Sequence, residues 1–366
     1  MRNGLLLALG LVAVPLSSLS KQQLPVAFTD EERMAISAFW SSENRYLVEQ
    51  ATQYQIRIPV EGSKWLWNLN NARGLTKGQK ATVDPNSAAY DKWIDAKISE
   101  ERWILEERYG IKQTLSAKPE AAGDVPAGLV KLAGMPPPLA EVVLPTKHTV
   151  RFSESESVTL ADNVAVPQRY AYYRFSRGVR TMGKPVASFP ADYLRKLFSL
   201  AKISESEQRV MMAVSPLEGG FDSVNTYDTG FISVGFIQFA CLSKGAGSLG
   251  AVLQQFKADA PDQFQESFRQ YGMDVAIDGR LVVFDPITKT ELVGLEAAMY
   301  MIDNPKYAAV FHLAGQRDEF RAAQLRIAKA MYYPGENDTV QVQLSGRTET
   351  FRVLDLVNSE AGLASL

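Results

Sequence analysis

Cysteine and histidine are scarce in this chain of 366 residues. The single cysteine, Cys241, excludes an internal disulfide framework and a metal site built from several thiolates, and its apolar neighbours predict that it is buried. The two histidines, His148 and His312, have no partner at ligand spacing, which argues against a histidine-rich zinc site or a His-based catalytic triad. We therefore expect no metal and no cofactor.

Neither sign of charge is in excess, with 39 Lys and Arg against 41 Asp and Glu. A protein whose main ligand is nucleic acid usually has a basic surplus, so no nucleic-acid partner is expected. Apolar residues make up 46% of the chain and charged residues 22%, which permits a sizeable core. The length predicts two domains or one large one.

The first apolar run, Leu5–Pro15, is too short to span a bilayer, which needs about 20 apolar residues. Arg2 precedes this run, and small residues around Ser18 come before Lys21. This three-part layout predicts a signal peptide over residues 1–20, in preference to a buried N-terminal helix. We expect a secreted or periplasmic protein with no membrane anchor beyond this segment.

Composition divides the remaining chain into four parts. Residues 21–117 have helical character and no recognisable role, and residues 118–146 are rich in Pro and Ala, as in a linker. A short β-rich segment follows over 147–189, and residues 190–366 are again mostly helical. We expect an α+β fold, mostly α, in which the N-terminal region is a candidate for docking an envelope protein.

The clearest local patterns are two N-terminal helices and one hairpin. Helices are expected over 29–56 and Ser87–Tyr109, the second ended by Gly110. Strands are expected over Asn225–Asp228 and Phe231–Phe239, joined by a turn. The tryptophans all lie in the N-terminal half, where a core role is favoured over a platform for sugar stacking.

Glu218 has the local surroundings of a catalytic acid. Ser204 is a strong cap for a helix that Pro216 and Gly219-Gly220 should stop, which places Glu218 at the C-terminal end. The helix dipole and apolar neighbours there raise a carboxyl pKa. Cleavage of a glycosidic bond needs such an acid to protonate the leaving oxygen. Taken alone, however, a glutamate at a helix end is usually only a solvated residue.

The segment that follows adds a resemblance. Glu218-Gly219, Tyr227-Asp228-Thr229, Ser233-Val234-Gly235 and Gln238 resemble the helix-end glutamate and hairpin of phage-type lysozymes, and Gly235-Phe236-Ile237-Gln238 is similar to a strand of lytic transglycosylases. The resemblance is confined to about residues 218–239. Asp228 lies one residue later than in the lysozymes, Ser233 replaces a threonine, and Gln238 stands near their usual histidine.

The resemblance implies a lysozyme-like helical domain over 190–366 with a small β-hairpin lobe. Glu218 would be the general acid, and Asp228 and Ser233 would position the attacking water. The residues that would contact the sugar are Asn225, Tyr227, Gly235 and Gln238. The function implied is a muramidase-type peptidoglycan glycosidase that cleaves β-1,4 bonds.

Three alternatives stay open. On the same scaffold, a lytic transglycosylase would need only Glu218, and a chitosanase-like glycosidase would act on a different glycan. A lysozyme-like fold can also serve as a non-catalytic module for glycan binding or envelope assembly, because a fold does not fix a function.

Overall fold

The computed structural model describes residues 27–75, 86–162, 176–344 and 347–365. The predicted signal peptide and a Tyr-rich run expected to be a strand, Arg169–Phe175, lie outside these residues. In the described part, helices combine with several small antiparallel sheets, and helix exceeds strand. This confirms the α+β class.

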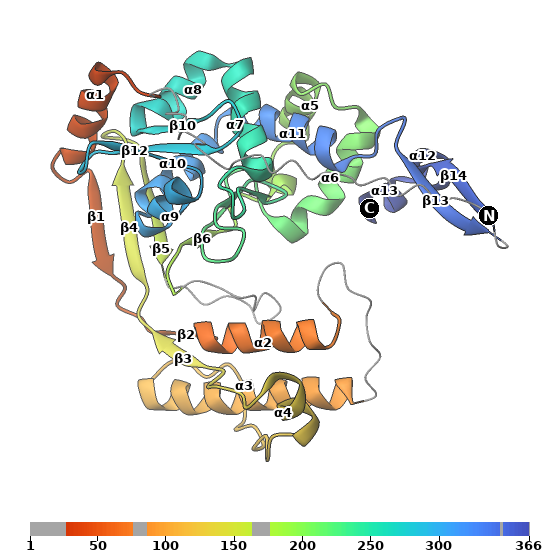
Figure 1. Cartoon of the computed structure of the whole chain (residues 1–366). Coiled ribbons are helices and arrows are strands. Elements are labelled where there is room, and N and C mark those ends of the chain that lie inside the picture. Colours follow the sequence, from red (N-terminus) through yellow and green to blue (C-terminus); the bar gives the residue numbers. More distant parts are fainter. Residues whose placement is uncertain (1–26, 76–85, 163–175, 345–346, 366) are drawn as a thin grey trace, which may run out of the picture.

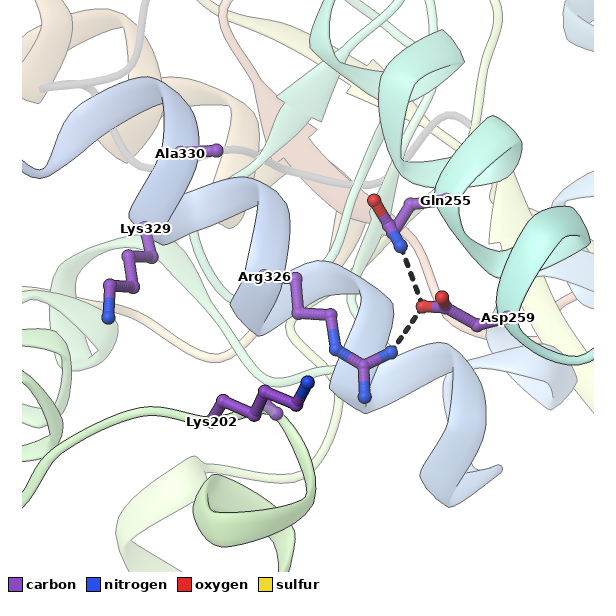
Figure 2. A pocket seen from close by; sticks show the side chains of 7 residues that line it. Lys202, Gln255, Asp259, Arg326, Lys329 and Ala330 are labelled. Carbon is purple, nitrogen blue, oxygen red and sulfur yellow. Dashed lines mark hydrogen bonds and ion pairs between the residues drawn. The ribbon is translucent and has the colours of Figure 1, made fainter.

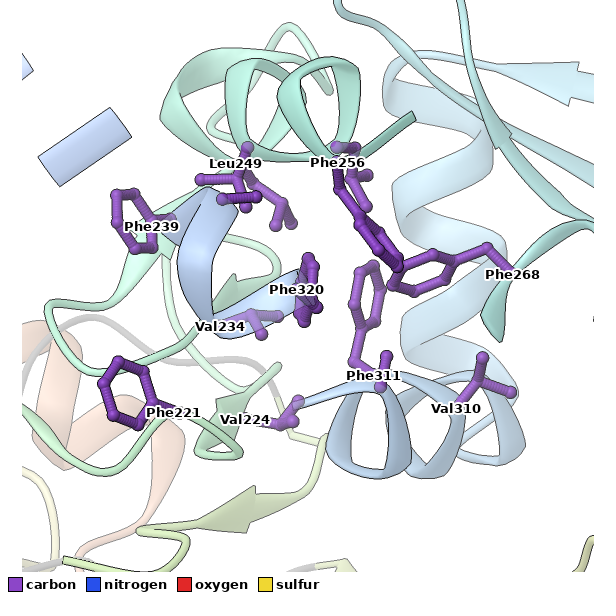
Figure 3. Close-up of a cluster of buried hydrophobic side chains, with 14 of the residues drawn as sticks. Phe221, Val224, Val234, Phe239, Leu249, Phe256, Phe268, Val310, Phe311 and Phe320 are labelled. Atoms are coloured by element: carbon purple, nitrogen blue, oxygen red, sulfur yellow. The ribbon is translucent and has the colours of Figure 1, made fainter. Parts of the chain in front are cut away.

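Most helices surround one core rich in phenylalanine (Figure 3). Phe268 contacts Phe311 and Phe320 with ring centroids 5.4 Å apart in both pairs. Such tilted and edge-to-face aromatic pairs contribute about 0.5–1.5 kcal/mol each beyond the burial of their area. The helices of this larger body are α5 (Ala191–Leu200), α6 (Glu205–Glu218), α7 (Gly247–Asp259), α8 (Pro261–Ser267), α9 (Leu295–Asp303), α10 (Lys306–Ala314) and α11 (Asp318–Tyr332).

Three small sheets belong to this body, and every strand pair in them is antiparallel. The sheet that follows α6 has the order β6-β7-β8-β9, with strands of two residues each. Its strands are β6 (Arg180–Thr181), β7 (Val224–Asn225), β8 (Ser233–Val234) and β9 (Phe239–Ala240). The others are β1 (Tyr46–Gln50), β4 (Thr146–Arg151) and β5 (Ser157–Asp162), and β10 (Met273–Val275), β11 (Leu281–Asp285) and β12 (Thr290–Val293).

The N-terminal helix α1 (Asp30–Ser41) packs on this C-terminal body (Figure 1). Glu32 closes a capping box with Thr29 and also forms an ion pair with Arg269, 2.7 Å between Oε1 and Nη2. The expected helix over 29–56 is therefore right only in its first half. The chain turns at Asn44, whose φ is 57°, and continues as β1, because pairing with β4 satisfies its backbone there.

Three helices form a smaller body with its own core (Figure 1). Helix α3 has the expected bounds, Ser87–Tyr109, and ends at Gly110 in the left-handed conformation. Most of the proline-rich range 118–146, expected to be a linker, packs in this body, because Leu129 and Leu139 are fully buried in its core. The other elements are α2 (Val60–Ala72), α4 (Ala127–Ala133), β2 (Gln55–Arg57) and β3 (Glu141–Val143).

Tryptophans contribute to both cores. Trp65 and Trp93 are buried in the smaller body, and Trp40 packs against the larger one, where its indole N–H donates to the Tyr271 carbonyl at 3.0 Å. The expected core role is thus confirmed for these three side chains. Past α11, the chain forms the hairpin β13 (Thr339–Leu344) and β14 (Arg347–Arg352), then α12 (Val353–Leu356) and α13 (Glu360–Ser365).

Candidate active site

Glu218 is the last residue of α6, as the sequence predicts. The helix begins at a capping box between Ser204 and Glu207, and at its other end the Ser215 hydroxyl donates to the Gly219 carbonyl at 3.1 Å. Gly220 must be a glycine, since a Cβ there would lie 2.1 Å from the Lys184 carbonyl oxygen. The chain passes close to residues 182–184 directly after Glu218, where the Gly220 N–H also donates to the Met182 carbonyl at 2.8 Å.

Glu218 lines a cavity of about 380 Å³, a volume within the usual range of small-molecule sites. The side chain is solvent-accessible, yet its neighbours displace enough water from the carboxyl to raise the pKa of Glu218 above its usual value. The wall of this Glu218 cavity is mostly apolar. It consists of Val210, Met211 and Val214 from α6, Ile237 and Gln238, Ala328 and Tyr332 from α11, Tyr333, and Leu363 and Ala364 from α13.

The expected single strand Phe231–Phe239 is wrong. It is interrupted after β8 by a turn over residues 235–238, in which Gly235 and Gln238 have φ angles of 89° and 54°. The two-residue alternation of side chains therefore ends at this turn. This turn places Gln238 in the wall of the Glu218 cavity.

Gln238 is held by two hydrogen bonds from its amide nitrogen. Nε2 donates to the Ser223 hydroxyl at 2.7 Å and to the Gly235 carbonyl at 3.1 Å. Both bonds use the donor end of the amide, which leaves its oxygen to accept a hydrogen bond from a ligand hydroxyl. Gln238 is thus an oriented polar group in a mostly apolar wall.

Asp228 and Ser233 belong to a different part of the lobe. The Asp228 carboxylate accepts hydrogen bonds from Asn225 Nδ2 and from the Gly230 amide, both at 2.8 Å. Asn225 and Ser233 are paired across β7 and β8, and the Ser233 hydroxyl lies close to Gly230. The structure therefore gathers these three predicted residues into one cluster, and none of the three lines the Glu218 cavity.

Two of the residues expected to bind sugar are packed inside the protein. Tyr227 is only 4% exposed. Gly235 packs so closely against Gln324 that a Cβ at position 235 would lie 2.2 Å from the Gln324 side-chain oxygen. Of the four residues expected to contact sugar, Gln238 is the one that lines the cavity.

Sequence reasoning missed the two tyrosines that end α11. Tyr332 is 55% exposed and presents an aromatic surface at the cavity, and burial raises the pKa of Tyr333. Their signal in the sequence is an aromatic pair at a helix end followed by Pro334. Exposed aromatic rings beside a cavity are suited to pack against sugar faces.

The sequence did not identify helix α13 as a wall of the cavity. Glu360 anchors it to α6 through hydrogen bonds from Ser206, at 2.8 Å, and from Arg209. Leu363 is then buried against α6 and closes one side of the cavity.

The part of the chain that is described also shows the surroundings of its metal-ligating side chains and of its single cysteine. No three His, Cys, Asp or Glu side chains there come together as a metal site, and none of the helices described is long and apolar enough to cross a membrane. Cys241 is buried as expected, and burial raises its pKa to about 11, which opposes formation of a thiolate.

Comparisons with protein-family models, with curated proteins and with solved structures give no match.

Proposed function

We propose that this protein is a glycosidase that cleaves the β-1,4 bonds of peptidoglycan, with Glu218 as the general acid. The observation that carries the proposal is a carboxyl of raised pKa at a helix end, in a cavity of sugar size. A raised pKa enlarges the protonated fraction of the carboxyl, which is the form that a general acid needs. The resemblance of residues 218–239 to the corresponding segment of phage-type lysozymes also supports the proposal.

The residues around Glu218 supply the other needs of the reaction. The Gln238 amide oxygen can accept a sugar hydroxyl, and the exposed Tyr332 ring can pack on a sugar face. Glu218 then donates its proton to the leaving glycosidic oxygen as the sugar acquires oxocarbenium character. The mostly apolar wall displaces part of the water from the carboxyl, which favours its protonated form.

The position of Asp228 favours transglycosylation over hydrolysis. Both of its carboxylate oxygens hold the lobe together, and the described wall of the cavity does not include it. A reaction in which the substrate's own hydroxyl attacks needs no second carboxylate. Glu218 alone would serve first as acid and then as base.

Digestion of purified sacculi tests the proposal. We expect soluble fragments whose sugar ends are anhydro forms when analysed by mass spectrometry. Reducing ends would instead indicate hydrolysis and restore a role for Asp228. Release from chitosan oligomers but not from sacculi would move the activity to another glycan. Binding to sacculi without release of fragments would contradict catalysis and favour a glycan-binding or assembly module.

The substitution Asp228→Asn separates the two mechanisms. Asparagine keeps the shape of the side chain, but it can no longer accept from both the Asn225 amide and the Gly230 N–H. We expect a lower melting temperature and a turnover rate on sacculi within about tenfold of wild type, because a general base would contribute about 10²–10⁴-fold. A loss of that larger size, with the fold intact by circular dichroism, would assign Asp228 to the chemistry.

The proposal places the protein outside the cytoplasm, secreted or periplasmic, where peptidoglycan lies. This location rests on the signal sequence predicted for residues 1–20. The smaller N-terminal body would then be available to an envelope protein.

A further inference from the structure

A second cavity, of about 500 Å³, lies against α11 on the side of Arg326 and Lys329 (Figure 2). Its wall also includes Lys202, which follows α5, and Asp259 from α7. Three cationic side chains and one carboxylate thus surround this space. We call it the Lys202–Arg326 cavity.

Arg326 is held in place by its neighbours. Nη1 is paired with Asp259, and Nη2 donates to the Leu200 carbonyl at 2.7 Å. Gln255 donates to the same Asp259 oxygen at 2.8 Å. A guanidinium has five N–H donors, so these two bonds orient the group and leave donors for a ligand. Lys329 also has a carboxylate partner, Glu207, with 2.9 Å between Nζ and Oε1.

Lys202 is the cation without a counter-charge. Among the described residues no carboxylate forms an ion pair with its ammonium group, and Figure 2 shows that group directed toward Arg326. Two positive groups that face each other across open space repel, and an anion between them removes the repulsion. An arginine and a lysine together fit such an anion well, one by paired N–H donors and the other as a point charge.

The backbone at Lys202 is a second observation. Its φ is 60°, and the following residue, Ile203, closes the helix end by donating to the Phe198 carbonyl at 2.9 Å. This is the position after a helix at which glycine is favoured, since a side chain in the left-handed conformation is strained. Glycine would be less strained at this position, so replacing Lys202 with glycine removes the ammonium group without disturbing the helix end.

We propose that the Lys202–Arg326 cavity binds the anionic oxygens of a small ligand, a carboxylate or a phosphate group, between these two cations. The cavity is larger than a single ion, and the remaining volume accommodates the sugar-sized body that carries the charge. The proposal does not depend on Glu218, whose cavity is lined by other residues of α11.

Isothermal titration of the full chain with inorganic phosphate and with D-glucuronate tests the proposal. We expect at least one probe to bind the wild type, and Lys202→Gly to weaken that binding at least tenfold without lowering the melting temperature. Lys289→Gly is the matched control, because Lys289 has nearly the same φ, 61°, and lies elsewhere, in the turn between β11 and β12. It should bind as the wild type does.

The two probes distinguish the source of the charge: tighter binding of phosphate indicates a phosphorylated ligand, and tighter binding of glucuronate an acidic sugar. Absence of binding to the wild type would overturn the proposal. Equal weakening by Lys202→Gly and Lys289→Gly would also overturn it, since the effect would then reflect net charge alone. Unchanged binding by Lys202→Gly would do the same.

Discussion

Replacing Glu218 with glutamine is expected to lower the rate of glycan cleavage by about 10²–10⁴-fold, the usual contribution of a general acid. The amide has nearly the shape of the carboxyl but has no acidic proton to give to the leaving oxygen. The rate is measured as release of soluble fragments from sacculi. Glu205→Gln, an exposed position in the first turn of the same helix, is the control and should keep wild-type activity.

The substitution Glu218→Gln is also expected to change the stability of the fold. Burial raises the pKa of Glu218 in the folded state above the ordinary glutamate value of 4.5, so the folded protein binds this proton more tightly than the unfolded chain. The corresponding stabilisation is present below the unfolded pKa and is lost as the pH rises through the folded pKa. We expect Glu218→Gln to melt at or above the wild-type temperature at pH 7, with the advantage vanishing near pH 4.

Calorimetry at the two pH values checks this sign. A variant that lost activity and also melted well below the wild type at pH 7 would show that Glu218 acts as a structural residue. Full activity in a folded Glu218→Gln protein would reject the proposed chemistry outright.

Replacing Gln324 with leucine is expected to lower the free energy of unfolding by about 2–4 kcal/mol, because it leaves two buried backbone groups without partners. Gln324 is fully buried in α11. Its Nε2 donates to the Phe221 carbonyl at 2.9 Å, and its oxygen accepts from the Phe236 amide at 3.4 Å. Leucine has a similar volume but satisfies neither group.

These two bonds connect α11 to the chain on both sides of the site. Phe221 follows Glu218 closely in sequence, and Phe236 lies in the turn that carries Gln238. Gln324→Leu should therefore also reduce glycan cleavage, measured under conditions in which the variant remains folded. Gln316→Leu, an exposed position just before α11, is the control and should change stability by less than about 0.5 kcal/mol. A comparably small effect at Gln324 would contradict this account.

Helix ends that are marked by residues close together in the sequence could be predicted. The capping box at Ser204, the glycine after α3 and the two glycines after Glu218 mark helix ends by interactions within a few residues. Local interactions of this kind are present in the sequence as spacing, so the position of Glu218 at a helix end followed from it.

The lobe after Glu218 was only partly predictable. The run Phe231–Phe239 has the composition of a strand, yet Gly235 and Gln238 adopt positive φ angles that break it. The reason is tertiary, since the turn packs on Gln324, 88 positions beyond Phe236. A pattern of residue types along one segment holds no information about such a contact, and long-range packing overrides β propensity.

The sequence by itself determined the helix end, the carboxyl placed there and the run of lobe residues that gave the resemblance. Tertiary structure decided which residues share a cavity with Glu218: Gln238, Tyr332 and Leu363 line it, and Asp228 does not. It also placed Lys202 opposite Arg326. The physical reason is the range of the interactions involved. Helix caps and turns depend on neighbours within a few residues, whereas a cavity and its charge depend on how distant helices pack.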